Sequence, residues 1–211
     1  MGFAMIAEVR AYWEALRDGA DLPRRAQIDP RGIEGALESA FLLERVAPGI
    51  ARFRLAGMQL NDLMGMEVRG MPLSSFFEPG SRNRMAEGLE QVFSLPGALE
   101  LRLEAERSLG RPALEARMLL LPLRSERGPV DLALGCLACE GQIGRSPRRF
   151  AIASQLVERL QSPVPVRPAP QPDARPLRKP AAVTGMSEAA APFRPAPPRG
   201  KPNLRLVKSD E

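Results

Sequence analysis

The chain has 211 residues, a length that fits one domain with an appendage, and it carries 30 Lys or Arg against 25 Asp or Glu. The charge is uneven, because residues 1–160 are neutral and the whole net charge of +5 lies in residues 161–211. This distribution argues against a nucleic-acid-binding body, and the absence of histidine excludes a histidine base, a histidine-ligated haem and phosphotransfer through a histidine.

Residues 1–20 predict an amphipathic helix at the N-terminus. Four apolar side chains recur at helical spacing, with charged side chains on the opposite side: Ile6, Val9, Trp13 and Leu16. A helix of this kind must bury its apolar stripe. We therefore expect it to cover the domain as a lid, to form a dimer contact, or to bind another partner.

Residues 21–145 predict the core of the domain. An extended connector leads to a short helix that begins at Asp29-Pro30, an acidic N-cap followed by a proline. The pattern then predicts strands at 41–46 and 52–56, short helices at 58–64 and 82–93, and strands at 99–107, 114–123 and 130–140. Arg54 alternates with inward-facing residues, so we expect it to point outward as a solvated or cross-strand partner.

The strand at 114–123 becomes apolar on both faces near its middle. A strand of this composition must be covered on both sides, and the N-terminal helix is the obvious cover for the outer side. The residues expected at this interface, whether within the chain or with a partner, are Ile6, Val9, Trp13, Leu16, Leu119 and Leu121.

Residues 146–160 predict a final helix, with apolar side chains along one side from Phe150 to Leu160. Residues 161–211 predict a disordered, basic, proline-rich tail, since 12 of the 22 prolines lie there and few apolar side chains could form a core. The tail is interpreted as a flexible linker. The alternative is that it attracts nucleic acid or another acidic surface, an effect that salt would weaken.

Several short segments, taken in order, resemble a bacterial PAS subfamily, the fifth, which has no assigned reaction. The resemblance spans about residues 5–140 and rests on Tyr12-Trp-Glu-Ala-Leu-Arg17, Leu22-Pro-Arg-Arg25, Ile28-Asp-Pro30, Phe41-Leu-Leu-Glu44, Phe53-Arg-Leu-Ala-Gly57, the series Leu60, Leu63, Gly65, Glu67 and Gly70, and Leu121-Pro-Leu123. It implies an α+β fold: a PAS-like five-stranded antiparallel sheet with helices on one face.

PAS domains bind small ligands in a cleft between the sheet and its helices, or pair with proteins through the outer face of the sheet. The resemblance places nine apolar residues at such a cleft, where they either line a ligand pocket or fill the core: Phe53, Leu55, Leu60, Leu63, Phe76, Val92, Phe93, Leu101 and Leu103. No cofactor is expected, because the chain has no histidine for haem and no cysteine in the middle segment for a flavin or coumarate adduct.

The two cysteines, Cys136 and Cys139, form a C-x-x-C pattern that invites a redox or metal interpretation. They lie in a predicted strand, where residues three apart point to opposite faces and are too distant for a disulfide. We therefore expect buried structural thiols, with a redox role as the alternative. We expect no metal site.

No catalytic constellation stands out, and we expect the chain not to be an enzyme. Glu104 and Glu106 lie on one outward strand face, and Ser74-Ser75 has no base nearby in the sequence pattern. No secretory or membrane-spanning segment is visible, so we expect a cytoplasmic protein that does not insert into a membrane.

The sequence thus predicts a non-catalytic PAS signalling module, a sensor or adaptor that regulates a protein partner such as a kinase or a transcriptional regulator, with a homodimer as one assembly. Two alternatives remain. The first is a sensor that binds a small ligand in the cleft. The second, which the neutral body disfavours, is a nucleic-acid-associated protein that acts through its basic tail.

Overall fold

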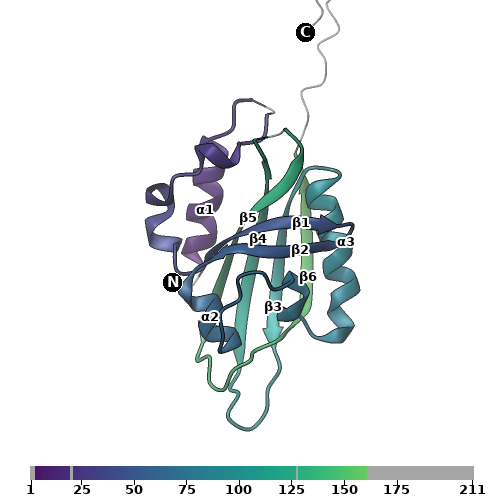
Figure 1. Ribbon diagram of the computed structural model, residues 1–211. Helices are drawn as coiled ribbons and strands as arrows, with labels where there is room; N and C mark the ends of the chain where they lie inside the picture. The colour runs from purple at the N-terminus through teal and green to yellow at the C-terminus, as the bar shows by residue number, and fades with distance from the viewer. Residues whose placement is uncertain (1–2, 20, 127, 161–211) are drawn as a thin grey trace, which may run out of the picture. The chain divides into compact units, whose positions relative to one another are not determined.

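Six antiparallel strands form one sheet in the computed structural model, which describes residues 3–19, 21–126 and 128–160 (Figure 1). The strand order is β2-β1-β5-β4-β3-β6, and every neighbouring pair is antiparallel. The bounds are β1 Ala40–Ala47, β2 Ile50–Ala56, β3 Gly97–Ala105, β4 Leu114–Arg124, β5 Val130–Gly141 and β6 Phe150–Arg159. The α+β antiparallel fold is confirmed, with one strand more than the five expected.

The additional strand, β6, corrects the prediction of a helix at 146–160. Phe150 and Ile152 alternate into the inner core, and the strand pairs with β3 along its whole length. The apolar spacing in this short segment fits a helix and a strand equally well. The pairing with β3 from Gly97 to Ala105 gives this segment its backbone hydrogen bonds and makes it the edge strand of the sheet.

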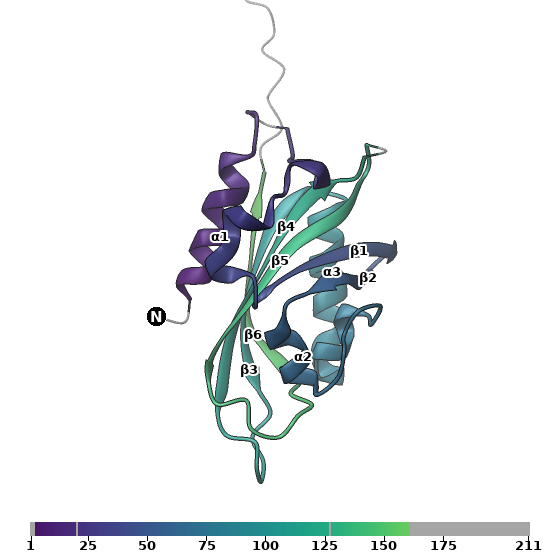
Figure 2. The same cartoon turned by 60° about the vertical axis from the view of Figure 1, so that its left-hand side comes forward.

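Helical elements cover both faces of the sheet (Figure 2). Helices α2 and α3 lie on the inner face, and α1 lies on the outer face. The helices are α1 Ala4–Ala15, α2 Met58–Met64 and α3 Arg82–Phe93, and the 3-10 turns are η1 Arg25–Gln27, η2 Pro30–Ala36, η3 Leu73–Phe76 and η4 Pro79–Ser81. The short helix expected after Asp29 is therefore the 3-10 turn η2, and the Asp29 carboxylate accepts a hydrogen bond from the Arg31 N–H at 3.0 Å.

Helix α1 buries its apolar stripe against the outer face of the sheet. Val9 and Trp13 are fully buried there with Leu119 and Leu121 of β4, and Ile6 is 7 % exposed. The indole N–H of Trp13 donates to the Pro122 carbonyl at 3.1 Å, so its one polar atom is satisfied in the core. Of the expected interface residues, Leu16 alone is only partly buried. Within the described chain, this stripe serves as a lid.

A buried arginine holds the two loops at one end of the sheet together. Arg148 is fully buried, and its guanidinium donates to three backbone carbonyls: Pro112 at 2.8 Å, Glu106 at 3.1 Å, and Ile143. Burial lowers the pKa of this guanidinium. Because the three acceptors come from the β3–β4 and β5–β6 connections, one side chain fixes the start of β6 against both loops.

We expect Trp13→Ala to lower the free energy of unfolding by about 3–5 kcal/mol, because it removes the largest buried side chain of the lid and leaves a cavity. Urea denaturation followed by circular dichroism measures the change. Glu14→Ala, at an exposed position of the same helix, is the matched control and should change stability by about 0.5 kcal/mol or less. Equal losses for the two variants would contradict the lid.

Arg148→Met should lower the free energy of unfolding by about 2–5 kcal/mol, because the apolar side chain fills the space but leaves three buried carbonyls without a donor. The same change at the exposed neighbour, Arg149→Met, should stay within about 0.5 kcal/mol of the parent chain. Thermal and urea unfolding of both variants provide the comparison. Indistinguishable midpoints would refute this role of Arg148.

Candidate functional site

Eight of the nine residues expected at the cleft lie in the inner core, between the sheet and helices α2 and α3. Each is at most 4 % exposed: Phe53, Leu60, Leu63, Phe76, Val92, Phe93, Leu101 and Leu103. The ring of Phe53 lies 5.2 Å from that of Phe76 and 5.3 Å from that of Phe41, measured between ring centroids. Aromatic rings thus pack against one another at the centre of the expected cleft.

Leu55 is the exception and corrects the sequence interpretation. In the pairing of β1 with β2, Leu42 faces Leu55 but Leu43 faces Phe53, so Arg54 is an extra residue without a partner. Such a β-bulge shifts the alternation by one residue and turns the following side chain to the opposite face. Leu55 is therefore 51 % exposed, on the outer face of the sheet.

The outer face is hollowed where α1 does not cover it. Two adjoining cavities, of about 200 and 520 Å³, share Arg25, Leu42 and Leu55, and together we call them the outer groove. Its floor is formed by β1, β2 and β5, and its near wall by the segment that contains η1 and η2. The groove has an apolar end and a polar end.

Aliphatic side chains line the apolar end of the outer groove. Leu37 and Leu55 are 40 % and 51 % exposed, a large fraction for leucines that line the same concave surface. The remaining apolar contributors are Ile28, Pro30, Ile33, Ala40, Phe41, Leu42, Ala56 and Leu134. This end therefore offers apolar area that a second molecule could bury.

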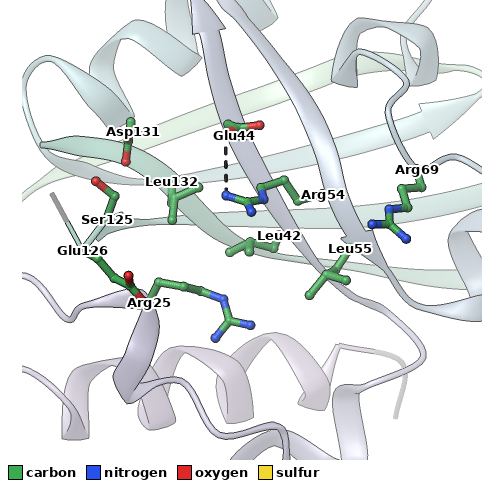
Figure 3. Close-up of a pocket in the computed structure, with 10 residues that line it drawn as sticks. All are labelled: Arg25, Leu42, Glu44, Arg54, Leu55, Arg69, Ser125, Glu126, Asp131 and Leu132. Carbon is green, nitrogen blue, oxygen red and sulfur yellow. Dashed lines mark ion pairs between the residues drawn. The ribbon is translucent and has the colours of Figure 1, made fainter.

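Charged side chains line the polar end (Figure 3). The Glu44 carboxylate accepts two hydrogen bonds from the Arg52 guanidinium, at 2.8 and 3.0 Å, and lies 3.6 Å from that of Arg54. Arg54 therefore points outward and pairs across the strand, as expected. The other charged side chains at this end are Arg25, Arg69, Glu126 and Asp131.

The hairpin that carries the groove is fixed to helix α3 by Glu90. Its carboxylate accepts hydrogen bonds from the Gly49 N–H at 2.6 Å, the Arg45 guanidinium at 2.8 Å and the Ser94 hydroxyl at 3.0 Å. The Gly49 N–H is the main cause that lowers the pKa of Glu90; Ser94 and Arg45 act in the same direction, against burial. The β1–β2 turn is thereby held to α3.

The two thiols lie on opposite sides of the sheet. Cys136 belongs to the outer core and Cys139 packs against the inner core, as their spacing on a strand predicts. Burial raises the pKa of both thiols to about 12. The nucleophilic thiolate is therefore scarce at neutral pH, which counts against the redox alternative.

Among the described residues, no helix is long and apolar enough to cross a membrane. Within the same residues, no group of three or more Cys, Asp or Glu side chains could hold a metal ion. The predictions for the tail at 161–211 lie outside the described residues.

Sequence reasoning missed most of the outer groove. Arg25, Leu37 and Arg69 come from a connector, a 3-10 turn and a loop, and none of these has a periodic pattern that marks one side chain. The only available signal was the succession Phe53-Arg-Leu55 in β2, where two apolar residues flank a charge. That pattern reads as regular alternation unless the bulge is known.

The family model of PAS subfamily 5, described as a PAS domain, matches residues 1–138. The match covers α1, the hairpin, the inner helices and most of β5, and it ends before β6. No protein in the comparison with curated sequences matches the chain. The matched region includes all the side chains of the outer groove.

We expect both native thiols to react far more slowly than free cysteine with 5,5′-dithiobis(2-nitrobenzoate) at pH 8. A rise in pKa from 9.0 to about 12 reduces the thiolate fraction about a thousandfold. In guanidinium chloride, both cysteines should titrate at the normal rate, which is the internal control. Rapid labelling of the folded protein would contradict the buried assignment.

Proposed function

The chain belongs to the PAS domain family, and from this premise we propose that it is a non-catalytic signalling module that regulates a partner protein by docking a segment of it in the outer groove. Family membership makes the chain a signalling or sensor module. Adaptor action and the use of the outer groove are the parts that we propose.

The packing of the inner core favours an adaptor over a sensor with an internal ligand. Phe41, Phe53 and Phe76 are at most 3 % exposed, and their rings pack at the centre of the expected cleft. A ligand there would have to displace rings that are already well packed, at a cost similar to that of overpacking a core. The inner face therefore supplies the rigid support for the sheet.

The outer groove is the observation that carries the proposal. Helix α1 covers β4 and part of β5, but the outer side of β1 and β2 stays open with Leu37 and Leu55 exposed. A concave apolar floor with a charged rim is typical of sites that bind a segment of another protein. A partner segment could therefore bind in the open groove on β1 and β2, next to helix α1.

We propose a non-catalytic role because the chain lacks the side chains that most often act as a base or as an activated nucleophile. The chain has no histidine, and burial holds both thiols in the protonated form. The expected partner remains a regulator such as a kinase or a transcription factor, whose activity would change when one of its segments is sequestered in the groove.

We expect a photo-crosslinking residue, p-benzoylphenylalanine, at position 55 to capture a partner in the cells that make this protein, because Leu55 is exposed on the groove floor. Mass spectrometry identifies the captured protein. With that partner purified, Leu55→Asp should weaken binding at least about tenfold, since a carboxylate would be forced into an apolar contact.

Leu109 provides the matched control, because it is 99 % exposed on the β3–β4 turn and lies outside the groove. Crosslinking from position 109 should be weak, and Leu109→Asp should leave the affinity unchanged. If both leucines crosslink equally, or if Leu55→Asp binds the purified partner as the parent chain does, the groove is not the docking surface.

A further inference from the structure

Three arginine side chains line the polar end of the outer groove. Arg25 comes from η1, Arg54 from the bulge in β2, and Arg69 from the loop that follows α2 (Figure 3). All three border the same cavity as Leu42 and Leu55. A molecule that buries apolar area on Leu55 therefore meets three guanidinium groups and three carboxylates, those of Glu44, Glu126 and Asp131.

The charges of the three guanidinium groups are only partly neutralised within the chain. The Oε2 atom of Glu44 accepts hydrogen bonds from two N–H groups of Arg52, and its Oε1 atom lies 3.6 Å from the Arg54 guanidinium. Among the described residues, no carboxylate lies within ion-pair distance of Arg25 or Arg69. Two guanidinium groups, and part of a third, thus retain donors for an anion.

Backbone hydrogen bonds fix the two segments that carry Arg54 and Arg69. The Gly70 N–H donates to the Phe53 carbonyl at 2.8 Å, and the Phe53 N–H donates to the Met71 carbonyl at 3.0 Å. Arg54 and Arg69 therefore flank this short pairing, at the edge of β2. Two arginines on a fixed backbone lose less entropy on binding a carboxylate than two arginines on free loops would.

Two of the three negative side chains of the groove lie apart from Arg54 and Arg69, whereas the third, Glu44 on β1, pairs with Arg52 and Arg54. Glu126 and Asp131 belong to the β4–β5 connection and the start of β5, whereas Arg54 and Arg69 lie at the β2 edge. This separation gives the groove a direction. A bound carboxylate is attracted to the β2 side and repelled from the β4–β5 side.

We propose that the segment docked in the outer groove is an acidic amphipathic peptide, with aliphatic side chains on Leu42 and Leu55 and carboxylates paired with Arg25, Arg54 and Arg69. This inference rests on the proposed docking function and names the chemistry of the partner. Carboxylates fit because guanidinium groups bind them through paired N–H donors.

The probe is a fluorescein-labelled peptide of Leu and Glu, roughly ten residues long, a length typical of peptides in such grooves. Matched peptides replace every Glu with Gln or with Lys. Fluorescence anisotropy with the full chain should give the tightest binding for the Glu peptide, by at least about tenfold over the Gln peptide, with a marked loss as salt is raised.

Variants of the chain locate the binding. Arg25→Gln and Arg69→Gln should each weaken binding of the Glu peptide by roughly three- to tenfold, as expected for partly exposed ion pairs. Arg102→Gln, at an exposed position on β3, is the matched control and should have no effect. Asp131→Asn removes a repelling charge and should leave binding equal or tighter. Circular dichroism checks that each variant is folded.

The outcomes separate the two proposals. If the Gln peptide binds as tightly as the Glu peptide and only Leu55→Asp weakens it, the acidic partner is wrong while docking in the groove stands. If the Lys peptide binds best and Asp131→Asn weakens it, the charge assignment is reversed and the inference fails. If none of the peptides binds, or if binding ignores both the arginine variants and Leu55→Asp, the inference fails as well.

Discussion

The structure depends on a sheet that is apolar on both of its faces. In β4 and β5, consecutive residues are buried, so that Leu119 and Leu121 face one layer while Met118 and Leu120 face the other. Leaving either face of these strands in water would cost about 1.5–3 kcal/mol per aliphatic side chain, at about 25 cal/mol per Å² of apolar area. The chain therefore needs a layer on each side, and α1 with Trp13 is as necessary to the fold as the inner helices.

The same constraint explains where the molecule stays open. Helix α1 is only 12 residues long, and its stripe covers the strands that require it most. The outer side of β1 and β2 is left to η2 and to side chains of mixed character, from Leu42 and Leu55 to Arg54. The bulge at Arg54 places an extra aliphatic side chain on this uncovered part. The candidate docking surface is thus the part of the outer face that the lid does not reach.

The two layers also divide the functional possibilities of a PAS domain. The inner layer, where ligands of such domains bind, is filled by packed phenyl rings around Phe53. The outer layer combines exposed leucines with guanidinium groups that have donors to spare. A rigid inner layer suits this arrangement, because the hairpin that carries the groove is held to α3 through Glu90 and cannot yield easily when a partner binds.

The sequence by itself determined the local elements and the need for two covering layers. The stripe of Ile6, Val9 and Trp13 and the doubly apolar strand predicted the lid, and the family resemblance together with the apolar patterns assigned eight cleft residues to the correct face. Only the tertiary structure decided the rest. That 150–159 is a strand depends on its pairing with β3, and the orientation of Leu55 depends on a bulge between two strands. Both are set by hydrogen bonds to residues distant in the chain, and local periodicity carries no information about those partners.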